Sequence, residues 1–113
     1  MNGDTEARMA ENEATFRDAN EQIMKRAREY EFSDPVPFLC ECGEPSCREI
    51  LRLTLEEYED VRSAGTRFFL VPGHEAVVDP SATIVNRTED YVVIEKAGTA
   101  GEVAERRDPR QKA

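Results

Sequence analysis

The chain has 113 residues, enough for one domain, of which 39% are hydrophobic and 35% are charged. Its formal net charge of −9 argues against binding to nucleic-acid phosphate, and the basic residues near the C-terminus (Arg106, Arg107, Arg110 and Lys112) are interpreted as a solvated end. No apolar run has the length of a membrane span, and the acidic start MNGDTEAR lacks the layout of a signal peptide. These features predict a cytoplasmic protein without a membrane or nucleic-acid partner.

Both ends are small, polar and charged, so we expect disorder at residues 1–4 and 108–113 and a single domain over residues 5–107. Within that domain we expect a helix over 5–31 and a zinc knuckle with a sheet over 36–107. The hydrophobic content is low for a globular domain, and a small domain with a thin core often depends on a bound metal.

Residues 5–31 contain no Gly or Pro and are rich in Ala, Glu, Arg and Gln, which predicts a long helix. One narrow apolar edge recurs every seven residues: Met9, Phe16, Ile23 and Tyr30. Glu13 and Asn20 interrupt it, so most of the helix surface is expected to be polar. The apolar edge either packs on the protein's own sheet or binds an unknown protein partner. An Asn such as Asn20 can specify helix pairing, so a homodimer is one candidate assembly.

Residues 38–42 and 50–53 are interpreted as the strands of a hairpin whose tip carries the cysteines. Thr54 and Glu57 form a capping box for a short helix, and Gly65 offers a C-terminal residue free to take positive φ. A break is expected at 79–81, and further strands are expected at 67–71, 82–86 and 91–95, with a weak last strand at 102–105. The predicted class is α+β, with a long N-terminal helix, a Cys-bearing β-hairpin, a short capped helix and a small antiparallel sheet, stapled by one zinc.

The three cysteines and the single histidine form a complete ligand set for one Zn²⁺ per chain: Cys40, Cys42, Cys47 and His74. Cys40 and Cys42 lie on alternate residues of an extended segment, and four residues that include Gly and Pro allow the chain to return with Cys47. Zn²⁺ takes four N or S ligands in a tetrahedron, and an odd cysteine count in a reducing compartment argues against disulfides. An iron–sulfur cluster and ordinary thiols are the alternatives.

The fourth ligand has alternatives too, because Glu41, Glu44, Glu75 or a water can replace His74. A catalytic zinc keeps an open position beside a carboxylate, and Glu75 is the candidate base, but three thiolates weaken the Lewis acidity of the metal, so we do not expect an enzyme. We expect a small non-enzymatic protein whose structural zinc supports protein–protein interaction or regulation. The alternatives are a zinc–thiolate redox switch and a small metal-dependent enzyme.

The strings FLCECGEPSC, LTLEEYEDVR, FFLVPGHE and YVVIEK resemble a group of small uncharacterised proteins from high-GC Gram-positive bacteria. The resemblance covers about residues 12–107. It implies a stand-alone soluble bacterial protein in which the three cysteines and the histidine of PGHE belong to one shared pattern, and it implies no activity. The Cys-x-Cys-x₄-Cys spacing alone also resembles the zinc knuckle that follows the catalytic domain of SET methyltransferases, from which only the ligand arrangement is carried over.

Overall fold

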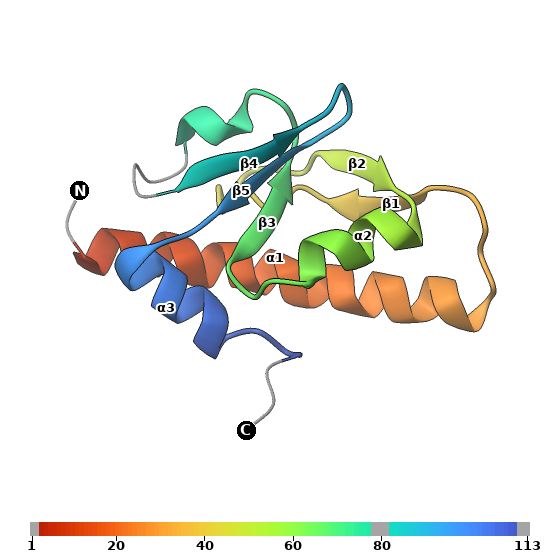
Figure 1. Cartoon of the computed structure of the whole chain (residues 1–113), viewed down its shortest axis with the longest axis horizontal. Helices are drawn as coiled ribbons and strands as arrows, with labels where there is room; N and C mark the ends of the chain where they lie inside the picture. The colour runs from red at the N-terminus through yellow and green to blue at the C-terminus, as the bar shows by residue number, and fades with distance from the viewer. Residues whose placement is uncertain (1–2, 78–81, 111–113) are drawn as a thin grey trace.

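A computed structural model describes residues 3–77 and 82–110 and confirms the predicted α+β class (Figure 1). In chain order the elements are α1 (Gly3–Glu29), β1 (Val36–Leu39), β2 (Ile50–Leu53), α2 (Leu55–Arg62), β3 (Arg67–Leu70), the 3₁₀ helix η1 (His74–Val77), β4 (Thr83–Arg87), β5 (Val92–Glu95) and α3 (Gly98–Arg106). The long α1 runs beneath both sheets, with α3 beside its N-terminal half (Figure 1). The predicted break at 79–81 falls outside the described residues.

The strands form two small antiparallel sheets, one of β1 and β2 and one in the order β3-β5-β4. The predicted C-terminal hairpin is confirmed as β4 and β5. The first strand was predicted over 38–42, and its end was wrong, because pairing stops where Leu39 faces Ile50. Cys40 and Cys42 therefore follow the strand, in the loop that leads to β2.

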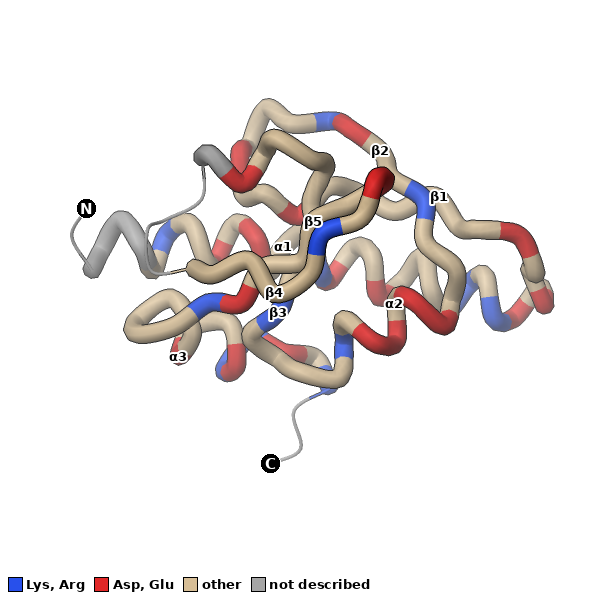
Figure 2. The backbone as a smooth tube through the Cα atoms, turned by 45° about the horizontal axis from the view of Figure 1, so that its top comes forward, with Lys and Arg blue, Asp and Glu red and all other residues tan. Residues whose placement is uncertain are grey.

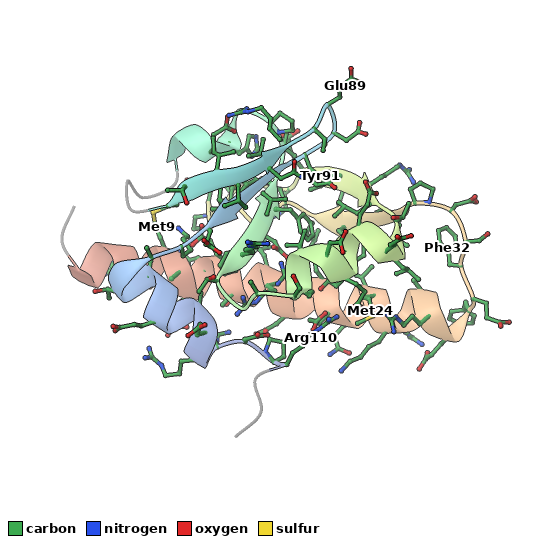
Figure 3. The ribbon with its side chains drawn as sticks, in the orientation of Figure 1. Met9, Met24, Phe32, Glu89, Tyr91 and Arg110 are labelled. Atoms are coloured by element: carbon green, nitrogen blue, oxygen red, sulfur yellow. The ribbon has the colours of Figure 1, made fainter. Side chains whose placement is uncertain are left out.

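α1 ends in a left-handed turn, two residues before its predicted end at residue 31. Glu31 has a φ of 51°, and the N–H groups of Glu31 and Phe32 donate to the carbonyl oxygens of Arg28 and Ala27, at 3.1 and 2.9 Å. This is the hydrogen-bond pattern of a Schellman motif, in which the left-handed residue is usually Gly. The turn leaves Tyr30 and Phe32 exposed at this end of the molecule (Figure 3).

The buried face of α1 differs from the predicted apolar edge. The residues of that edge are half-buried or, at Tyr30, 75% exposed: Met9, Phe16, Ile23 and Tyr30. Glu13, Arg17 and Asn20 are instead fully buried, as are Ala10 and Ala14. The helix thus packs on the rest of the chain through a face that a hydrophobicity pattern assigns to solvent.

Each buried polar side chain of α1 has a partner on another element. Glu13 forms a fully buried ion pair with Lys96, at 2.9 Å, and Arg17 donates to the carbonyl oxygens of Gly65 and Ala104. Asn20 donates to the carbonyl oxygen of Leu39 and accepts from its N–H. Since the amide of Asn20 is used within the chain, it is not available to specify pairing with a second helix.

The capping box of α2 is confirmed. The N–H of Glu57 donates to Thr54 Oγ1 at 3.1 Å, and the N–H of Thr54 donates to Glu57 Oε1 at 2.8 Å. The positive φ predicted at Gly65 is wrong, because α2 ends through Ser63 in the right-handed conformation. A β-carbon at Gly65 would lie 2.7 Å from a carboxylate oxygen of Asp108, a side chain that would have to move.

The last strand predicted at 102–105 is wrong, because these residues belong to α3. Ala100 and Val103 bury their side chains against Ala10 of α1. A β-carbon at Gly101 would lie 3.0 Å from the carbonyl oxygen of Lys96, so this helix has a glycine where the chain passes close to itself. The small residues of α3 therefore allow tight helix packing.

Two of the basic residues near the C-terminus, Arg107 and Arg110, contact α1 and α2. Arg107 pairs with Glu11 and Asp18, and Arg110 pairs with Glu21 and Glu59 (Figure 3). Arg110 thus has defined contacts within the segment expected to be disordered from residue 108, while residues 111–113 lie outside the described part of the chain.

Three aromatic rings form the centre of the core. Phe38 of β1 stacks on Tyr58 of α2 with ring centroids 4.5 Å apart, and Phe69 of β3 meets both edge-on at 5.9 Å. They join the first hairpin, α2 and the second sheet. Among the described residues, no helix combines the length and the apolar character that crossing a membrane requires.

Candidate metal centre

The loop between β1 and β2 positions the three cysteines. The N–H of Cys40 donates to the carbonyl oxygen of Glu49 at 3.0 Å, which keeps the two arms of the loop together beyond the strands. The N–H of Glu41 donates to Phe69 on β3, also at 3.0 Å, and a turn bond from Cys47 to Glu44 brings the third thiol back. Gly43 turns the chain with a φ of +82°, where a β-carbon would lie 2.8 Å from Glu13 of α1.

His74 reaches the same place from the second sheet. A Pro-Gly turn follows β3, with the N–H of His74 donating to the carbonyl oxygen of Val71 at 3.0 Å. His74 is the first residue of η1, and its Nδ1 faces the cysteines. The loop and this turn are far apart in sequence. The hydrogen bonds from Glu41 to Phe69 and from Val71 to Cys40 hold them next to each other.

The four predicted ligands come together. Their Sγ and ring-nitrogen atoms all lie within 4.8 Å of one another, and His74 Nδ1 is 3.4 Å from Cys40 Sγ and 3.7 Å from Cys47 Sγ. Metal–ligand distances of about 2.3 Å for sulfur and about 2.0–2.1 Å for nitrogen give a tetrahedron with sulfur–nitrogen edges of about 3.6 Å. The cluster therefore has the size of a Cys₃His site and could hold one metal ion.

Two further groups contact the ligands from outside. The N–H of Val71 donates to Cys40 Sγ at 3.3 Å, and Glu49 Oε2 lies 2.9 Å from His74 Nε2. Histidine ligands commonly donate their second ring N–H to a carboxylate, which orients the ring and selects its tautomer. The sequence alone does not single out Glu49, because carboxylates are abundant in this chain and nothing local links it to a histidine 25 positions later.

Burial affects the chemistry of the thiols. It raises the pKa of Cys40 well above the ordinary value for a thiol, and it also raises the pKa of Cys42. Without a cation the site therefore favours neutral thiols. A bound divalent ion would favour the thiolates and release their protons, so metal binding would be coupled to pH.

The alternative fourth ligands are engaged elsewhere. Glu41 is fully buried and bonded to groups of the core, Glu44 accepts hydrogen bonds from Ser46, and Glu75 accepts one from Arg87. Glu75, the candidate catalytic base, also accepts a hydrogen bond from the N–H of Gly73. His74 is thus the group that the described geometry offers to complete the shell.

Glu41 connects the site to the polar core. It lies between two of the ligands, and its carboxylate accepts from Asn20 at 2.8 Å, from Arg62 at 3.1 Å and from the N–H of Phe69 at 3.2 Å. Burial raises the pKa of Glu41, while Arg62, Asn20 and Phe69 act in the opposite direction. The Glu41 carboxylate therefore anchors the loop to α1, α2 and β3.

One side of the cluster faces solvent. Cys40 and Cys42 are buried, but Cys47 is half-buried and the side chain of His74 is 27% exposed. A pocket of about 190 Å³ lies on this side, lined by Cys42, Glu44, Cys47, Gly73 and His74. A small reagent can therefore approach the third thiol.

Comparison with known proteins does not assign the chain to a family. No family model matches the chain, and neither a curated protein nor a solved structure matches it. The functional conclusion therefore rests on the Cys₃His cluster and on the surfaces around it.

Proposed function

We propose that the chain is a small non-enzymatic zinc-binding protein whose single zinc is structural and which acts through protein–protein interaction. The observation that carries the proposal is the compact Cys₃His cluster, in which each donor comes from the protein. Three sulfurs and one imidazole suit Zn²⁺ better than the hard cations, which prefer oxygen. Four protein donors favour a structural ion over a catalytic one, which needs an open position.

The proposed zinc would add to the hydrogen bonds that already join the loop after β1 to β3 and the turn after it, from Glu41 to Phe69 and from Val71 to Cys40. It would tie the loop after β1 to the turn after β3, and so connect the two sheets at one end. Structural zinc contributes on the order of 10 kcal/mol of folding free energy in small domains, comparable with the total stability of many proteins. Membership of the bacterial group and a cytoplasmic compartment, where thiols stay reduced, belong to the same proposal.

Metal analysis of protein purified without added zinc tests the proposal. We expect one zinc per chain in the natural protein and in Ser46→Ala, a control change in the same loop, and loss of zinc in Cys47→Ser. Chelation should also abolish the dispersed amide spectrum of the folded chain. Protein without zinc, or a brown iron-containing protein, would contradict the proposal, and so would a folded metal-free chain of unchanged stability.

The second candidate is a zinc–thiolate redox switch, which the pocket beside Cys47 favours. Two zinc-bound thiolates and one peroxide, with two protons, would give a disulfide, two waters and free Zn²⁺. Release of zinc by mild peroxide, followed with a coloured chelator, checks this. If zinc stays bound while the thiols of unfolded protein react, the switch is ruled out.

A further inference from the structure

β2 has an open edge. It pairs with β1 on one side, and among the described residues no third strand pairs with it. In an antiparallel pair, hydrogen-bonded and non-hydrogen-bonded positions alternate. The N–H of Cys40 donates to the carbonyl oxygen of Glu49, so Cys40 and Glu49 are a hydrogen-bonded pair and the next pair, Leu39 and Ile50, is not. Ile50 and Arg52 therefore direct their N–H and C=O groups away from β1. Pro37, which has no N–H, lies opposite Arg52 at such an outward position.

A groove runs along this edge. Its volume is about 640 Å³, and it is lined by Pro35, Glu49, Ile50, Leu51, Arg52, Glu57, Val71 and Asp90. The acidic turn between β4 and β5 lies beside β2 (Figure 2), and Glu89 marks its tip (Figure 3). One wall is therefore the open strand and the other comes from the second sheet. β2 spans about 13 Å at about 3.3 Å per residue, which matches a short extended segment.

The lining indicates which segment would fit. Glu49, Glu57 and Asp90 supply three carboxylates against the one guanidinium of Arg52, so the groove attracts positive charge. Ile50 is 52% exposed although it is aliphatic, and Val71 adds a second apolar group. An extended chain that alternates basic and aliphatic residues would satisfy the outward backbone groups, the charges and the apolar contacts together.

We propose that a protein partner inserts an extended segment of alternating Lys or Arg and Val or Ile along the open edge of β2. This inference rests on the proposed function, because the metal site holds both walls of the groove. Glu49, at the start of β2, contacts His74, and Val71, on the other wall, donates its N–H to Cys40 Sγ. The zinc would thus set the distance between the walls, and its removal would weaken peptide binding.

The test uses the full zinc-loaded chain and a labelled Lys-Val-Lys-Val-Lys peptide in a fluorescence anisotropy titration. The controls are the same peptide with N-methylated valines and a Glu-Val-Glu-Val-Glu peptide. We expect saturable binding of the basic peptide and at least tenfold weaker binding of both controls. Amide shifts should concentrate at Ile50–Arg52, Val71 and Asp90. Equal binding of the N-methylated or acidic peptide would overturn the proposal, and so would shifts centred on α1 or no binding at all.

A matched pair of variants tests the strand itself. Ile50→Pro removes an outward N–H that β1 does not use, whereas Ile50→Val keeps it and the aliphatic surface. We expect at least tenfold weaker binding for the first and less than threefold for the second. If Ile50→Pro does not fold, the N-methylated peptide on the natural chain decides. Zinc content is measured on the same samples, so zinc-loaded protein that binds no peptide refutes this inference alone, and absence of zinc refutes the proposed function.

Discussion

Replacing Glu41 by glutamine tests whether the buried anchor beneath the cysteine loop is needed for stability. The carboxylate is 0% exposed and each of its oxygens accepts hydrogen bonds, from Arg62 and the N–H of Phe69 at one oxygen and from Asn20 at the other. Glutamine keeps the volume but offers one acceptor oxygen and one donor group. Its amide nitrogen would therefore face a donor, and Arg62, 2% exposed, would lose its countercharge.

Breaking a buried ion pair by removing one partner costs about 3–5 kcal/mol. We therefore expect Glu41→Gln to lower the free energy of unfolding by about that amount in urea titrations with excess zinc. Glu44→Gln is the matched control, because Glu44 lies in the same loop but is exposed, and its effect should stay within about 0.5 kcal/mol. A loss below about 1 kcal/mol for Glu41→Gln, with zinc bound and an unchanged urea slope, would refute the assigned role.

Glu49→Gln should weaken zinc binding about tenfold in a competitive chelator titration, because His74 loses an orienting carboxylate; unchanged affinity contradicts that role. Thr54→Ala removes the cap of α2 and should lower the free energy of unfolding by about 1 kcal/mol in urea, against no change if the cap is unimportant. Glu31→Gly removes a β-carbon from a residue in the left-handed conformation and should raise the free energy of unfolding by about 1 kcal/mol. A decrease would contradict the proposed backbone strain at this position. Arg110→Gln tests pH dependence. Burial alone would raise the pKa of Glu21, but hydrogen bonds from Arg110 and Tyr58 outweigh it and lower the pKa. The stabilisation is then complete above about pH 4.5 and is lost as the pH falls through the folded pKa, so the stability deficit of the variant at pH 7 should close on acidification. A deficit that does not shrink as the pH falls contradicts this.

The ligand set could be predicted from the sequence because cysteine and histidine are rare here and a metal demands a fixed number of donors. The capping box of α2 could be predicted because its two hydrogen bonds join residues three positions apart. Both features depend on local chemistry or on counting, which a single sequence contains. Glu49 belongs to the same site but could not be found this way, because its contact with His74 exists only after the two sheets have met.

The orientation of α1 could not be predicted, because hydrophobic periodicity assumes that charged residues face water. Glu13 and Arg17 are buried, since Lys96 and the carbonyl oxygens of Gly65 and Ala104 compensate them from distant parts of the chain. A strand was predicted at 102–105, but these residues belong to α3. Gly101 lowers helix propensity but is needed where the helix passes the carbonyl oxygen of Lys96. Tertiary contact outweighs local preference in both helices.

X-ray absorption at the zinc edge tests the central claim most directly, because it counts and identifies the atoms bound to the metal. The purified, zinc-loaded chain should show three sulfurs at about 2.3 Å and one nitrogen at about 2.0–2.1 Å, supplied by Cys40, Cys42, Cys47 and His74. Cys47→Ser should lose the zinc signal, and Ser46→Ala should leave the spectrum unchanged. A shell of oxygens, a shell with fewer than three sulfurs in the natural chain, or a spectrum that does not respond to Cys47→Ser would contradict the account.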